Sequence, residues 1–211
     1  MSSCKIEPRI VQRIFFEEFN HELGLAFRYS WSASDEFGWV RTASLENLTD
    51  RPMRATILDG LRNILPYGAP LSLFQQASNL VDAYKKTEVD PESGPGIFSL
   101  TAGITDRAEA IEVLRANTVW CCGLDGFLVH LSLGAVSAFR QGHVITGESL
   151  VNGARGNYLV SCPLELAGGA TSRWHLVGDS GRDQVQVATL RRRLLDQENL
   201  ADDIMAALQQ S

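Results

Sequence analysis

The sequence predicts a mainly β protein, an antiparallel β-sandwich with a short internal helix and a helical C-terminus. Apolar and polar side chains alternate over residues 25–31, 53–57, 98–104 and 158–166, and clusters of turn-forming residues separate these segments. Such alternation is typical of strands with one buried face, because successive side chains point to opposite sides of a sheet. About eight to ten strands of this kind would make two packed sheets.

The N-terminal third is expected to form an antiparallel meander that carries aromatic side chains. Residues 9–23 fit a helix or a strand, and we favour a strand because the break at Gly24 leads directly into the next one. Turn-forming residues from Asn47 to Pro52 precede a third strand, which should end at Asp59 before a compact loop over Gly60 to Gly68. The strands of this meander are residues 25–32, 37–47 and 53–59.

Helical spacing occurs in two places. Apolar residues between 71 and 84 recur at intervals of three and four, which predicts a short helix across one face or end of the sheet. Another apolar stripe between Gly181 and Gln210 predicts one or two helices. We therefore expect a β-sandwich domain over residues 1–180 and a C-terminal helical linker or cover over residues 181–211.

The second half contains the clearest strand. Residues 158–166 alternate without a break, and Gly168-Gly169 should turn this strand into a hairpin with residues 172–178. Residues 117–122 are apolar and β-branched, which also fits a strand, whereas residues 128–141 could be helical or irregular.

Composition excludes several classes of partner. Hydrophobic residues make up 45% of the chain and charged residues 21%, as in an ordinary globular protein. The net charge of -6 argues against nucleic acid, whose phosphates need a basic face. No apolar run approaches the roughly 20 residues of a membrane span. Without an apolar segment near the N-terminus a signal peptide is not expected, and the four cysteines fit a reduced, cytoplasmic chain.

No catalytic motif stands out. The sequence has no Gly-x-Ser-x-Gly elbow, no phosphate-binding glycine loop and no His-Glu-x-x-His pair. The four histidines and four cysteines show no metal-ligand spacing. We therefore expect no metal, no cofactor and no catalytic residue, and the isolated chain is not expected to be an enzyme.

The N-terminal meander carries the candidate carbohydrate site. Its tryptophans could stack on a sugar ring while the arginines bond to hydroxyls. We favour the alternative that both tryptophans are core aromatics on either side of the turn Ser32–Gly38, because periodicity places Trp31 on the apolar face. Asp59 could be a buried acceptor that holds the following loop through its amides, which we favour, or a catalytic acid. The candidate residues are Trp31, Trp39, Arg41, Asp59 and Arg62.

The same segment resembles a known family. The runs Tyr29-Ser30-Trp31, Phe37-Gly38-Trp39-Val40-Arg41 and Leu45-Glu46-Asn47-Leu48, continuing into residues 59–68, resemble the β-sandwich domain that precedes the (α/α)-barrel in large bacterial carbohydrate-active proteins. Those proteins are related to cellobiose and chitobiose phosphorylases and to cyclic glucan synthases. The helical exit after Asp183-Gln184 is similar too. The resemblance implies a super-sandwich of the galactose-mutarotase-like type.

The resemblance also implies a role. In that group the catalytic acid lies in the helical barrel, so the sandwich supports the barrel, helps to close the cleft and contributes to dimer contacts. The implied function is a non-catalytic domain of a glycoside phosphorylase-like or hydrolase-like protein. Its implied partners are an oligosaccharide or glucan, a helical-barrel catalytic domain and a second copy of the chain. At 211 residues, however, the chain is shorter than a complete two-sheet super-sandwich of these enzymes.

Two other functions stay open. A free-standing carbohydrate-binding module requires Trp31 or Trp39 to be exposed on a flat or grooved face. A dimerisation or interaction domain would need no ligand. Unpaired strand edges and the apolar C-terminal stripe favour a two-fold dimer. In the monomeric alternative the C-terminal helix folds back onto its own sheet.

Overall fold

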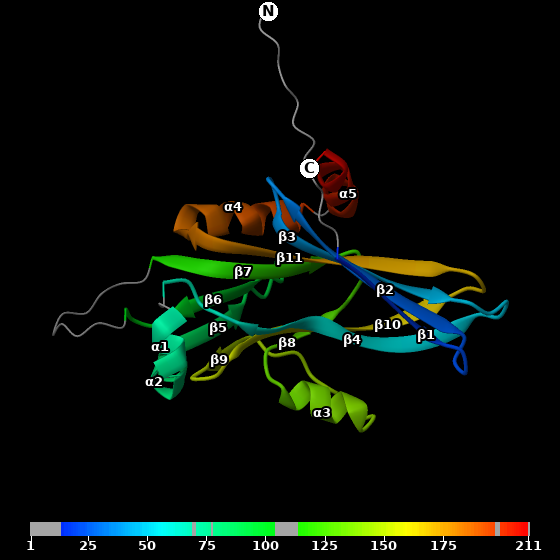
Figure 1. Cartoon of the computed structure of the whole chain (residues 1–211), viewed down its shortest axis with the longest axis horizontal. Coiled ribbons are helices and arrows are strands. Elements are labelled where there is room, and N and C mark those ends of the chain that lie inside the picture. Colours follow the sequence, from blue (N-terminus) through cyan, green and yellow to red (C-terminus); the bar gives the residue numbers. More distant parts are fainter. Residues whose placement is uncertain (1–13, 69–70, 77, 104–113, 197–198, 211) are drawn as a thin grey trace, which may run out of the picture.

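The chain forms two sheets that pack face to face (Figure 1). The computed structural model describes residues 14–68, 71–76, 78–103, 114–196 and 199–210. Within them lie eleven strands, eight in a large sheet and three in a small one, and every pair is antiparallel. The predicted mainly β sandwich is confirmed, with slightly more strands than expected.

Strands from both ends of the chain meet in the large sheet. It contains, from edge to edge, β1 (Ile14–Asn20), β2 (Leu25–Ser34), β3 (Gly38–Asn47), β11 (Thr171–Asp183), β7 (Arg115–Cys122), β6 (Gly96–Leu100), β5 (Lys85–Val89) and β9 (Leu150–Asn152). The small sheet contains β4 (Met53–Ile64), β10 (Gly156–Leu166) and β8 (Leu128–His130). The C-terminal strand β11 therefore joins the N-terminal hairpins to the rest of the large sheet.

Five helices lie around the sheets in the part of the chain that the structure describes. The predicted helix over residues 71–84 is two short helices, and the ambiguous stretch 128–141 is a short strand followed by a helix. Among the described helices, none is long and apolar enough to cross a membrane. The helices are α1 (Leu71–Gln76), α2 (Ser78–Tyr84), α3 (Gly134–Arg140), α4 (Gln184–Leu195) and α5 (Leu200–Gln210).

The large sheet is buried on both faces at its centre. Trp174 of β11 packs with Tyr158 of β10 in the core between the two sheets. On the opposite face, Trp120 of β7 packs with Leu194 of α4 and Ile204 of α5. The C-terminal helices thus cover their own sheet, as Figure 1 shows, and the apolar stripe expected to favour a dimer is used within the chain.

The predicted three-stranded meander is wrong in two respects. Of the three predicted strands, only the first two, β2 and β3, pair with each other. The third, β4, belongs to the small sheet. In addition, β4 does not end at Asp59 but continues through Gly60 to Ile64, because β10 pairs with it to that point. A side chain at Gly60 would place its Cβ 2.2 Å from the carbonyl oxygen of Tyr158. Gly60 therefore serves a close approach between two strands instead of a turn.

The predicted hairpin between residues 158–166 and 172–178 is also wrong. The turn at Gly168-Gly169 does join β10 to β11, but β10 pairs with β4 and β8, whereas β11 pairs with β3 and β7. Tyr158 and Trp174 both point into the same core. The two strands therefore face each other across the sandwich, each with its apolar face inward.

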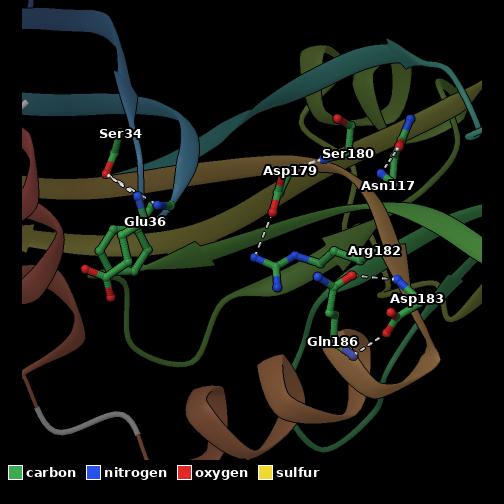
Figure 2. A network of polar contacts seen from close by, with 10 residues as sticks. Ser34, Glu36, Asn117, Asp179, Ser180, Arg182, Asp183 and Gln186 are labelled. Carbon is green, nitrogen blue, oxygen red and sulfur yellow. Dashed lines mark hydrogen bonds and ion pairs between the residues drawn. The ribbon is translucent and has the colours of Figure 1, made fainter.

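A polar network marks the passage from β11 into α4 (Figure 2). Gly181 has a positive φ of 71°, and its N–H donates to the side-chain oxygen of Asn117 at 3.0 Å. Asp183 then caps the helix: its carboxylate accepts from the N–H of Gln186, whose side chain accepts from the N–H of Asp183. Local hydrogen bonds therefore set the angle at which α4 returns over the sheet.

Candidate functional site

The first three strands carry a row of aromatic side chains on the face that looks toward the small sheet. Odd-numbered residues of β3 share this face with Ala43 and Leu45, which are buried in the core between the sheets. Strand pairing aligns the odd residues of β2 and the even residues of β1 with them. We call this surface the aromatic face, and it comprises Phe16, Phe27, Tyr29, Trp31 and Trp39.

The two candidate tryptophans lie at the end of the aromatic face where β3 begins. Trp39 is 63% exposed, and Trp31 is half-buried. Trp31 pairs with Arg41, and Ala33 pairs with Trp39, so the two tryptophans are diagonal neighbours on adjacent strands. Diagonal neighbours are within reach of large aromatic side chains. The prediction that both tryptophans are core residues is therefore wrong for Trp39.

Other aromatic rings extend the row from β1 into the core. Phe16 stacks on Tyr29 with ring centroids 4.6 Å apart and an angle of 16° between the planes. Phe27 stacks on Trp174 at 6.1 Å. The guanidinium of Arg41 lies over Tyr29, 4.3 Å from the ring centroid. The exposed tryptophan thus stands beside rings whose positions are fixed by packing.

Arg41 and Asp59 form an ion pair that joins the two sheets. The Nη1 of Arg41 on β3 donates to Oδ2 of Asp59 on β4 at 2.5 Å, and Nε1 of Trp174 donates to the same oxygen at 2.7 Å. Both charged side chains are nearly buried, with 8% and 13% of their surface exposed. The predicted structural role of Asp59 as an acceptor agrees with this geometry. Among the described residues, however, its side-chain donors come from the opposite sheet instead of the following segment.

Arg62 lies apart from the other candidate residues. It is three positions beyond Asp59 on β4, so the two side chains point to opposite faces of the small sheet. Arg62 is exposed and pairs with Asn157 on the outer face. The structure thus brings together four of the five candidates, Trp31, Trp39, Arg41 and Asp59, and separates the fifth.

A serine–histidine pair, which sequence patterns did not reveal, lies on the outer face of the small sheet. Nδ1 of His130 is 2.9 Å from the carbonyl oxygen of Thr146, and Nε2 is 2.8 Å from Oγ of Ser161. A carbonyl only accepts, so Nδ1 donates to it, and Nε2 shares a second hydrogen bond with the Ser161 hydroxyl. Ser161 lines a pocket of about 700 Å³, but it is 6% exposed and His130 is fully buried. This geometry is that of a satisfied buried polar pair.

The three cysteines in the described part of the chain behave as buried apolar residues. Cys121 and Cys122 lie in β7 and Cys162 lies in β10, and all three are free thiols. Burial raises the pKa of Cys122 to about 12 and that of Cys121 well above its usual value. At neutral pH both are therefore unreactive thiols. The part of the chain that the structure describes contains no group of histidine, cysteine and carboxylate side chains that could hold a metal ion.

Comparisons with known proteins give little more. No family model and no curated protein matches the sequence. Among solved structures, the chain is similar to a bacterial glucoamylase complexed with acarbose, with 10% identity and a TM-score of 0.42. The match covers 91% of this chain and 25% of that one, so the chain spans about a quarter of the solved protein's length. A likeness this weak assigns neither a family nor an activity.

Proposed function

We propose that the chain is a non-catalytic, carbohydrate-binding β-sandwich domain that belongs beside a catalytic helical barrel in a glycoside hydrolase-like or phosphorylase-like protein. The observation that carries the binding role is the exposure of Trp39 beside Trp31 on the aromatic face. An exposed indole beside a second aromatic ring offers a flat apolar surface, and the flat apolar face of a pyranose is a fitting ligand for it.

The surroundings of Trp39 suit an uncharged saccharide. Arg41 and Asp59 neutralise each other and are nearly buried, so neither is free to attract a charged ligand. The β4 strand forms one edge of the small sheet, and among the described strands only β10 pairs with it. Backbone groups on the free side of β4 can bond to sugar hydroxyls. Stacking would supply affinity, and the strand edge would supply orientation.

The hydrogen bonding and burial of the candidate polar groups support the non-catalytic role. Asp59 is engaged by two donors, and the Ser161–His130 pair is buried. The resemblance of the N-terminal segment to sandwich domains that precede a helical barrel supports the place in a larger protein. Sequencing of the gene beyond the codon for Ser211 tests that place: a continuing reading frame with a helical barrel is expected, and a different fold there would contradict it.

Calorimetric titration with cello-oligosaccharides tests the binding role. We expect saturable binding by the wild-type chain and a loss of at least tenfold in affinity for Trp39→Ala, because stacking is removed. Trp39→Phe should keep part of the affinity. The matched control is Leu48→Ala, which changes an exposed apolar residue just beyond the end of the same strand and should bind as the wild type does.

A negative result would favour the other candidate function. If neither cello-oligosaccharides nor other gluco-oligosaccharides bind, or if Trp39→Ala binds as well as the wild type, the aromatic face does not recognise sugar. An exposed Trp39 would then favour the interaction-domain interpretation, in which this face contacts protein. Calorimetry is preferred to tryptophan fluorescence here, because removal of Trp39 also removes the reporter.

A further inference from the structure

Strand β1 is the least protected element of the described structure. It lies at the edge of the large sheet (Figure 1), and among the described strands it pairs only with β2. All seven of its residues are exposed, although four of them are large and apolar. These four are Ile14 (59% exposed), Phe15 (60%), Phe16 (45%) and Phe19 (46%).

The opposite edge of the same sheet is built differently. Its edge strand, β9, has three residues, which is a common way to limit unwanted pairing. The β1 strand has seven residues, with apolar side chains on both faces and a free row of backbone N–H and C=O groups. An edge of this kind fits another strand, because pairing would satisfy the backbone and cover both apolar faces together.

We propose that β1 pairs antiparallel with β1 of a second copy of this chain, across a two-fold axis at Phe16, so that two large sheets become one continuous sheet. This inference does not rest on carbohydrate binding. It names the strand and the register of the dimer that the sequence left open.

The side-chain pattern limits the register, and the ring of Phe16, stacked on Tyr29, favours one of the registers that remain. A two-fold axis perpendicular to the sheet keeps each residue on its own face, so only registers that pair residues of equal parity are allowed. An axis at Glu17 would set two carboxylates directly opposite each other, which is unfavourable. An axis at Phe16 pairs Phe16 with its copy, Phe15 with Glu17 and Ile14 with Glu18, and no two carboxylates meet.

The charges and rings already present fit this register. Glu17 is held by Arg28 of β2, which it shares with Glu46, so its carboxylate is partly compensated at the edge. The Phe16 ring is already stacked on Tyr29. Pairing at Phe16 would therefore align four rings across the joined sheet, in the order Tyr29, Phe16, Phe16 and Tyr29. A self-complementary edge of this kind is best satisfied by a second copy.

Disulfide cross-linking tests the strand and the register. In a Cys4→Ser background, Phe16→Cys should form an intermolecular disulfide under mild oxidation, because directly opposite Cβ atoms in antiparallel strands are about 4.5 to 5.5 Å apart. The matched control is Glu18→Cys on the same face. Its two copies would be displaced by four residues, or about 13 Å, which no disulfide spans. Equal cross-linking of both variants, or of neither, would overturn the proposed register.

Sedimentation tests the association itself. The wild-type chain should approach twice its monomer mass of 23.2 kDa as concentration rises. Phe16→Arg should shift the dissociation constant upward by at least tenfold, with the circular dichroism spectrum unchanged because the residue is exposed. The inference is wrong if the wild-type chain stays monomeric at every concentration, or if Phe16→Arg dimerises as the wild type does.

Discussion

The centre of the large sheet and its β1 end follow opposite rules. In the centre, β11 is covered by the small sheet on one face and by α4 and α5 on the other, and Trp174 is completely buried. At the end, every residue of β1 is exposed, and Trp39 stands 63% exposed nearby. The same residue types are thus packed into the core in one region and exposed to solvent in the other. Under the two proposals made above, stability and recognition are separated along one sheet.

The sharpest test of this separation compares two tryptophans. Trp174→Ala should lower the free energy of unfolding by about 3 to 5 kcal/mol, because it empties a core position and removes a donor to Asp59. Trp39→Ala should change it by about 0.5 kcal/mol or less, since little packing is lost. Urea denaturation of both variants measures the difference. Equal losses would show that the two regions are not distinct.

A second comparison sets a buried ion pair against an exposed one. Asp59→Ala leaves Arg41 buried without its partner and should cost about 3 kcal/mol. Glu165→Ala removes the partner of Arg54, where both side chains are more than two-thirds exposed, and should cost about 0.5 kcal/mol or less. The same denaturation assay applies. A large loss of unfolding free energy for Glu165→Ala would contradict the expectation that buried pairs contribute more to stability than exposed ones.

The pH dependence of stability gives a smaller effect at the sheet centre. Burial, helped by nearby Arg173, lowers the pKa of His175 to about 4 from a usual value of 6.5. The unfolded chain therefore takes up this proton first as the pH falls, and stability is lost between pH 6.5 and pH 4. The loss should be about 2 to 3 kcal/mol.

His175→Asn isolates this contribution, because asparagine can still bond to Thr42 but does not titrate. The variant should unfold with a flatter pH profile between pH 6.5 and pH 4 than the wild type. Carboxylates that titrate in the same range affect both proteins equally. Superimposable profiles would mean that His175 is not held neutral by burial.

Sequence periodicity predicts which face of a strand is apolar, but it says little about which strands pair or pack together. Alternation correctly places Trp31 on the apolar face of its strand, but it cannot say how far the opposite sheet extends, so it does not predict the exposure of Trp39. The Gly168-Gly169 turn was correctly placed too. A turn of this kind joins strands within one sheet or across two, and the choice depends on packing between segments far apart in sequence.

Local patterns also failed where a residue serves a distant contact. Gly60 was interpreted as the start of a loop, although its conformation serves the close approach of β10, almost 100 residues later. The acceptor role of Asp59 was expected, but its donors Arg41 and Trp174 lie on strands of the other sheet. Such contacts depend on the order of the strands in the two sheets, which sequence periodicity does not reveal.

The position of β11 between β3 and β7 has a consequence for how the chain folds. Its pairing joins Thr171 to Glu46, so the middle of the sheet is closed by residues more than 120 positions apart. Contacts of this range are slow to form, because a long loop must close first. During synthesis, the N-terminal hairpins and the strands β5 to β7 stay separate from each other, and the edges that β11 later joins are unpaired. Until β11 leaves the ribosome, both halves keep unpaired strand edges, which are a general route to aggregation.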